Sequence, residues 1–77
     1  MTEVATHGDQ ELDHLVEMSN DIARNFSFHA DGVDRIADHM TRFWAPILRR
    51  RIIEHVEGGG AGLSDSAIAA VKKLQKP

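Results

Sequence analysis

The sequence predicts an all-α protein: a small bundle of four helices, the third and fourth short, with no β-sheet. Apolar residues recur three or four positions apart along most of the chain, and no stretch alternates as a half-buried strand does. Pro46 and the glycines at 58–60 and 62 interrupt this pattern. The helices are expected at about 10–27, 32–44, 46–57 and 65–75.

The first helix has the clearest pattern, and Asp9 is a suitable N-cap for it. Glu11 follows in the first turn, where a negative charge favours the helix dipole. Its apolar residues at helical spacing are Leu12, Leu15, Val16, Ile22, Ala23 and Phe26. Residues 1–8 lack periodicity and are predicted to form a flexible tail, so that 9–77 make a single helical domain.

The middle of the chain is predicted to hold two helices with a sharp break at Trp44 and Ala45. Asp31 is the expected cap of the second helix. Pro46 disfavours a helix interior but suits the first turn of a new helix. The apolar face of the second helix comprises Val33, Ile36, Ala37, Met40 and Phe43 or Trp44, and that of the third comprises Leu48, Ile52 and Val56, with Ile47 and Ile53 beside it.

The glycine-rich run at 58–62 ends the third helix and is predicted to be a flexible turn. Ser64 is the expected cap of the fourth helix, which has one weak apolar side. A phosphate-binding loop would follow a strand and end in Gly-Lys-Ser/Thr, whereas this run follows a helix and precedes Leu63. A helix connection is therefore the better interpretation.

Composition excludes several classes of protein. The chain has no cysteine, so it forms no disulfide, thiolate metal site or cysteine-ligated iron–sulfur cluster of its own. A net charge of −3 argues against binding nucleic acid or an anionic membrane. The first twenty residues are polar and acidic, unlike a signal peptide, and no apolar run approaches the ~18 residues of a membrane helix. The expected location is the cytoplasm.

No catalytic, cofactor-binding or metal-ligating residues are predicted. The five histidines never stand at the i,i+4 spacing of a helical zinc site, and the serines lack a G-x-S-x-G elbow. A chain of 77 residues also leaves little interior for a substrate cavity.

The most unusual stretch holds two aromatic residues followed by arginines. Tryptophan and arginine are enriched among the anchors of protein interfaces. Consecutive helical positions point about 100° apart, so at most one of the two rings can face the middle of a thin core. Whether the stretch is an interface or a core with a solvated face stays open on these grounds. The candidate interface residues are Arg42, Phe43, Trp44, Pro46, Arg49, Arg50 and Arg51.

From about residue 12 to residue 74, the chain resembles the formate dehydrogenase delta subunit family. The matching segments are 15–23 (LVEMSNDIA), 36–40 (IADHM), 42–46 (RFWAP), the arginines at 49 and 50, and 58–63 (GGGAGL). The most specific part is the Phe-Trp-x-Pro element with its arginines and the glycine–leucine turn.

The resemblance implies a small accessory subunit of the cytoplasmic, molybdenum-dependent and NAD-linked formate dehydrogenase. The large subunits of that enzyme hold the molybdenum cofactor, the iron–sulfur clusters and flavin. The delta chain would carry no cofactor and would bind the larger subunits, the molybdenum-containing catalytic subunit first among them, in stability or assembly. Trp44 or Phe43 is then the expected apolar anchor, Pro46 fixes the kink, and the four arginines make polar contacts.

Two other functions stay open from the residues. A small nucleic-acid-binding or regulatory module could use the arginines of the third helix, although that helix offers no asparagine or glutamine to read base edges. A chaperone could instead grip the phosphates of the molybdenum cofactor with the same arginines during insertion.

Overall fold

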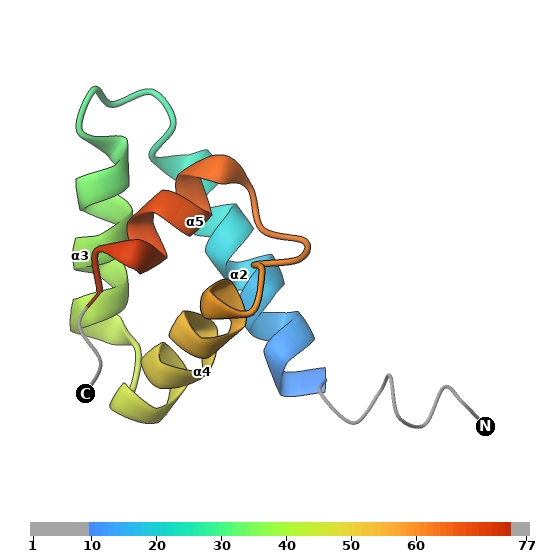
Figure 1. The fold of residues 1–77 in the computed structure, drawn as a ribbon. Helices are drawn as coiled ribbons and strands as arrows, with labels where there is room; N and C mark the ends of the chain where they lie inside the picture. The colour runs from blue at the N-terminus through green and yellow to red at the C-terminus, as the bar shows by residue number, and fades with distance from the viewer. Residues whose placement is uncertain (1–9, 75–77) are drawn as a thin grey trace.

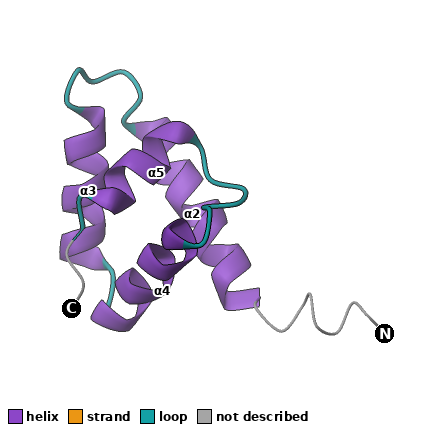
Figure 2. Cartoon of the chain, viewed as in Figure 1, coloured by secondary structure: helices purple, strands orange, loops and turns teal. Residues whose placement is uncertain are grey.

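The computed structural model describes residues 10–74, which form four helices joined by loops (Figures 1 and 2). No strand occurs among these residues, so the predicted all-α fold class is confirmed. The helices are α2 (Gln10–Asn25), α3 (Gly32–Phe43), α4 (Pro46–Glu57) and α5 (Asp65–Lys72). The expected tail at 1–8 and the expected Asp9 cap lie outside the described residues.

The break between α3 and α4 lies where it was predicted. Trp44 and Ala45 both have extended backbone conformations, with ψ near 138° and 149°. Because a proline disfavours the α conformation in the residue before it, Pro46 ends one helix and begins the next. The first helix ends at Asn25 instead of 27, and α5 ends at Lys72 instead of 75.

Only one of the two expected caps within this range makes a capping hydrogen bond. The Ser64 hydroxyl accepts a hydrogen bond of 3.2 Å from the Ala67 N–H, as predicted. Asp31 stands at the N-cap position of α3, as predicted, but its side chain makes no capping hydrogen bond. Its carboxylate accepts a 2.8 Å hydrogen bond from Arg35 Nε, one turn further along. The guanidinium competes with the helix N–H groups for the carboxylate.

The short helix α5 packs against each of the other three. In Figure 1 it lies beside α3 and above α4, while α2 runs behind them. Helix α2 also packs against α3 and α4. Because α5 contacts both α3 and α4, it helps to fix the positions of the two helices that flank the break.

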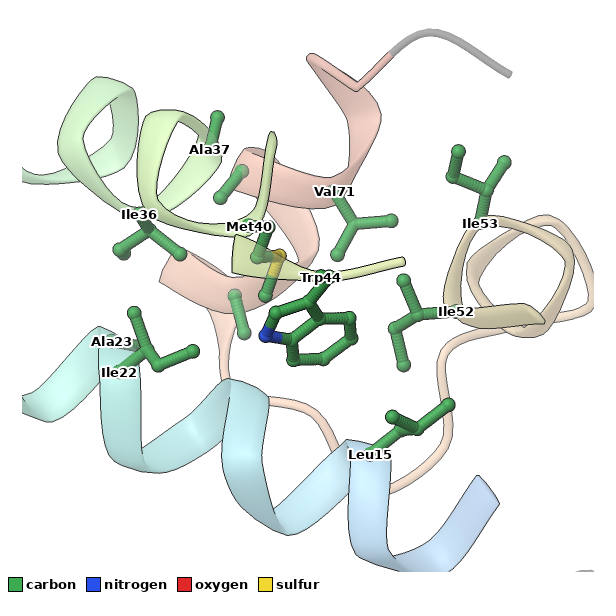
Figure 3. Packing of buried hydrophobic residues seen from close by; sticks show 12 residues of the cluster. Leu15, Ile22, Ala23, Ile36, Ala37, Met40, Trp44, Ile52, Ile53 and Val71 are labelled. Atoms are coloured by element: carbon green, nitrogen blue, oxygen red, sulfur yellow. The ribbon is translucent and has the colours of Figure 1, made fainter. Parts of the chain in front are cut away.

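The core lies between the four helices (Figure 3). Trp44 is its largest side chain and is only 6% exposed. In Figure 3 its indole lies among side chains from α2, α3, α4 and α5. The other buried apolar residues are Leu15, Ile22, Ala23, Ile36, Ala37, Met40, Ile52, Ile53, Ala67, Ala70 and Val71. One side chain from the corner between α3 and α4 is therefore built into the centre of the fold.

The glycine-rich loop before α5 is held to α2 by one side chain. Asn20 Nδ2 donates a 2.8 Å hydrogen bond to the Gly62 carbonyl, and Asn20 Oδ1 accepts one of 2.8 Å from the Ser64 N–H. Gly59, Gly60 and Gly62 have positive φ, the conformation for which glycine is suited. The predicted turn is thus a loop tied down at its end, which positions α5.

Candidate partner-binding surface

The two aromatic residues at the end of α3 point in different directions. Trp44 is buried, whereas the neighbouring Phe43 is 71% exposed. This agrees with the prediction that at most one ring faces the middle of the core. Because Trp44 is closed in by the fold, its expected role as an anchor needs correction. Phe43 is the ring that the corner exposes.

Arg49 holds the corner together from within the chain. Its Nη1 atom donates a 2.6 Å hydrogen bond to the Trp44 carbonyl and one of 3.2 Å to the Thr41 carbonyl. These carbonyls lie at the C-terminal end of α3, where acceptors have no helical N–H partner and the dipole favours a cation. The guanidinium therefore bridges the break and sets how α4 leaves α3.

The other three arginines lie nearer the surface. Arg42 Nε is 2.9 Å from Asp38 Oδ2 in an exposed ion pair one turn apart. Arg51 Nη1 is 3.0 Å from Glu11 Oε1 and so joins α4 to the start of α2. Arg50 is exposed on α4. Of the arginines expected as contacts, Arg42 and Arg50 are the most accessible, and Arg49 acts in the fold.

A second exposed apolar side chain follows Pro46. Ile47 is 64% exposed, although the sequence placed it beside the apolar stripe of its helix. It borders a shallow hollow between α4 and the start of α2, which Leu12 and Arg50 also line. The corner thus presents Phe43 at the end of α3 and Ile47 at the start of α4.

Three rings form a row that the sequence did not predict. It runs from Phe43 through His39, both on α3, to Phe26 in the turn after α2. The centroids of Phe43 and His39 are 4.8 Å apart, and those of His39 and Phe26 are 6.2 Å apart. The i,i+4 spacing of His39 and Phe43 was a visible signal for half of this row. Phe26 was predicted only as one of the apolar residues of the first helix, and it is partly buried and packs against the core.

The ionisable side chains of residues 10–74 are the groups that could bind a metal ion or show a shifted pKa. No group of three or more histidine, aspartate or glutamate side chains in this range could hold a metal ion. The hydrogen bond from Arg35 lowers the pKa of Asp31 below its ordinary value, and this exposed pair lies at the start of α3, at the edge of an open, shallow hollow.

Residues 14–71 match the family model of the NADH-dependent formate dehydrogenase delta subunit FdsD. The chain belongs to this family. The matched range runs from the first turns of α2 to the last turn of α5, and it includes Phe43, Pro46 and all four arginines of the corner. The resemblance seen in the sequence is therefore confirmed. No curated protein and no solved structure matches the chain.

Membership of the delta-subunit family implies that the chain is an accessory subunit that associates with other subunits of formate dehydrogenase. None of the helices between residues 10 and 74 is long and apolar enough to cross a membrane.

Proposed function

We propose that this chain is a non-catalytic, cofactor-free subunit that binds the molybdenum-containing catalytic subunit of formate dehydrogenase in the cytoplasm. It stabilises the assembled enzyme or assists its assembly. The observation that carries the proposal is the exposure of Phe43 next to the buried Trp44. Family membership supplies the identity of the enzyme.

Phe43 is suited to be an anchor because its surroundings hold it in place. Pro46 restricts the backbone after the helix, and Arg49 ties the end of α3 to α4. Full burial of a phenylalanine side chain is worth about 1.5–3 kcal/mol. A rigid anchor loses little conformational entropy on binding. Arg42 lines the same hollow as Phe43, and Arg50 lines the hollow beside Ile47, so both exposed side chains can contact the polar rim of an interface.

The test is co-purification of the catalytic subunit with this chain and with its Phe43→Ala variant. Loss of a central aromatic contact costs more than about 1 kcal/mol, which weakens binding by at least roughly fivefold. Phe28→Ala is the matched control, because Phe28 is 90% exposed but lies in the turn between α2 and α3. We expect it to bind as the unchanged chain does.

Omission of the chain tests the role in stability and assembly. We expect the remaining enzyme to lose activity and molybdenum content, or to lose them faster on heating. A large subunit that assembles with full activity, metal content and thermal stability in the absence of this chain contradicts the proposal.

The arginines of α4 give less support to nucleic-acid binding than their sequence indicated. Arg49 donates to backbone carbonyls and Arg51 pairs with Glu11, so both are engaged within the chain. Binding of duplex DNA that falls steeply with salt would favour that alternative. We expect no such binding.

A further inference from the structure

The three phenylalanines of the chain all lie outside the buried core, and two of them belong to one surface feature. We define the aromatic row as Phe26, His39 and Phe43. Phe26 and His39 are half-buried and Phe43 is exposed. Leucine, isoleucine, valine, alanine, methionine and tryptophan fill the core without them. A shallow hollow lies along the row on the outer side of α3.

The spacing of the row matches the repeat of an α-helix. Its two steps are 4.8 Å and 6.2 Å between ring centroids. One turn of a helix rises about 5.4 Å, and side chains three or four positions apart are about 5–6 Å from each other. Apolar side chains on one face of an incoming helix would therefore meet successive rings. Recognition of an amphipathic helix in a groove uses this i, i+3/i+4, i+7 pattern of anchors.

The charges beside the row compensate one another. Asp31 pairs with Arg35 at 2.8 Å, and Asp38 pairs with Arg42 at 2.9 Å. Asp34 Oδ1 lies 2.8 Å from Nζ of Lys73, the residue after α5. The carboxylates of Asp31, Asp34 and Asp38 thus each have a cation beside them. The face carries no excess of one sign, as nucleic acid, an anionic membrane or a strongly acidic protein would require.

We propose that the aromatic row receives an amphipathic helix of a formate dehydrogenase subunit, which lays an uncharged apolar face across the rings of Phe26, His39 and Phe43. This inference rests on the proposed function, since it assigns a surface and a partner chemistry to the same association. The balanced charges complement a neutral helix face, and they make an interaction that depends little on salt.

Affinity measurements on the purified chain and the catalytic subunit test the chemistry of the contact. His39→Glu places a charge in the middle of the row and is expected to weaken binding at least tenfold. His14→Glu introduces the same charge at an exposed position of α2 and is expected to change affinity less than twofold. For the unchanged chain, raising salt from low to high concentration should alter affinity less than threefold.

The fold of each variant is checked by circular dichroism. If His39→Glu does not fold, Phe43→Asn replaces it, because a side chain that is 71% exposed contributes little to the core. A tenfold loss for Phe43→Asn then shows that the exposed end of the row contacts the partner, and the crosslinks from position 39 test its middle.

Photo-crosslinking groups at positions 39 and 43 test the helical form of the partner. We expect the two positions to label partner residues on one helix, three or four positions apart. Labels on alternate residues of a strand, equal affinities for His39→Glu and His14→Glu, or a steep loss of affinity with salt would each overturn the inference while leaving the association intact. If the unchanged chain binds no formate dehydrogenase subunit, the proposed function itself fails.

Discussion

Trp44 and Phe43 are adjacent aromatic residues, and their alanine variants should affect different properties. Trp44 is 6% exposed and Phe43 is 71% exposed. Replacing a buried tryptophan or phenylalanine by alanine costs about 3–5 kcal/mol, because contacts are lost and a cavity remains. Trp44→Ala should therefore lower the free energy of unfolding by about that amount. Phe43→Ala should change it by less than about 0.5 kcal/mol, as surface substitutions usually do.

The expected loss is large relative to the stability of so short a chain. Natural domains are stable by roughly 0.05–0.15 kcal/mol per residue, which is about 4–12 kcal/mol for this length. Trp44→Ala would remove a quarter of that at the least, and at the lower limit it would unfold the chain. Phe43→Ala should leave the fold intact while it weakens the complex.

Urea unfolding followed by far-ultraviolet circular dichroism measures both effects. Helix content is the appropriate signal, because Trp44 is the only tryptophan and its removal abolishes indole fluorescence. A midpoint for Trp44→Ala equal to that of the unchanged chain would refute the placement of the indole in the core. So would a Phe43→Ala variant that is less stable than Trp44→Ala.

Three further substitutions test the contacts that set the arrangement of the helices, each by urea unfolding. Arg49→Gln should lower the free energy of unfolding by about 1–3 kcal/mol, because it removes the charged donor to the carbonyls at the end of α3. An unchanged free energy of unfolding would show that this bridge across the break is dispensable. Asn20→Ala should lower the free energy of unfolding by about 1–2 kcal/mol, because it removes two hydrogen bonds to the loop before α5. An equal decrease in the control variant Asn25→Ala would exclude that explanation. Gly32→Ala should lower the free energy of unfolding by about 1–3 kcal/mol, since the added Cβ would lie 2.6 Å from the backbone oxygen of Phe26. An unchanged unfolding midpoint would mean that the turn relaxes to make room for the methyl group.

The helices themselves could be predicted because local rules decide them. Apolar residues at helical spacing located all four helices, and Pro46 located the break to the residue. The divergence of Phe43 and Trp44 followed from helix geometry alone. Which ring turns inward could not be predicted, because it depends on how α5 packs against α3 and α4.

Predictions about polar side chains were less successful, since these groups have several partners within reach. Asp31 does occupy the N-cap position of α3, but its carboxylate accepts a hydrogen bond from the Arg35 guanidinium one turn away and not from the helix N–H groups. Arg49 was expected at an interface. Its actual acceptors are backbone carbonyls across the break, which become neighbours only when α4 leaves α3 at the observed angle.

The aromatic row needed the tertiary structure for a similar reason. His39 and Phe43 stand one turn apart on the same helix, and their contact was available from spacing. Phe26 belongs to the turn after α2 and reaches His39 only because the chain reverses between α2 and α3. Sequence reasoning can find pairs within one element, but not a surface assembled from two.

Some residues of the corner support the fold and others are exposed on its surface, and binding data on variants must be interpreted with this difference in mind. Loss of the complex in Trp44→Ala or Arg49→Gln is expected even if neither side chain touches the partner, because both support the corner that carries Phe43. Only residues that are exposed in the chain alone can report contact directly. Phe43 is therefore the most informative position, and a variant there that keeps its unfolding midpoint while losing the partner identifies the interface.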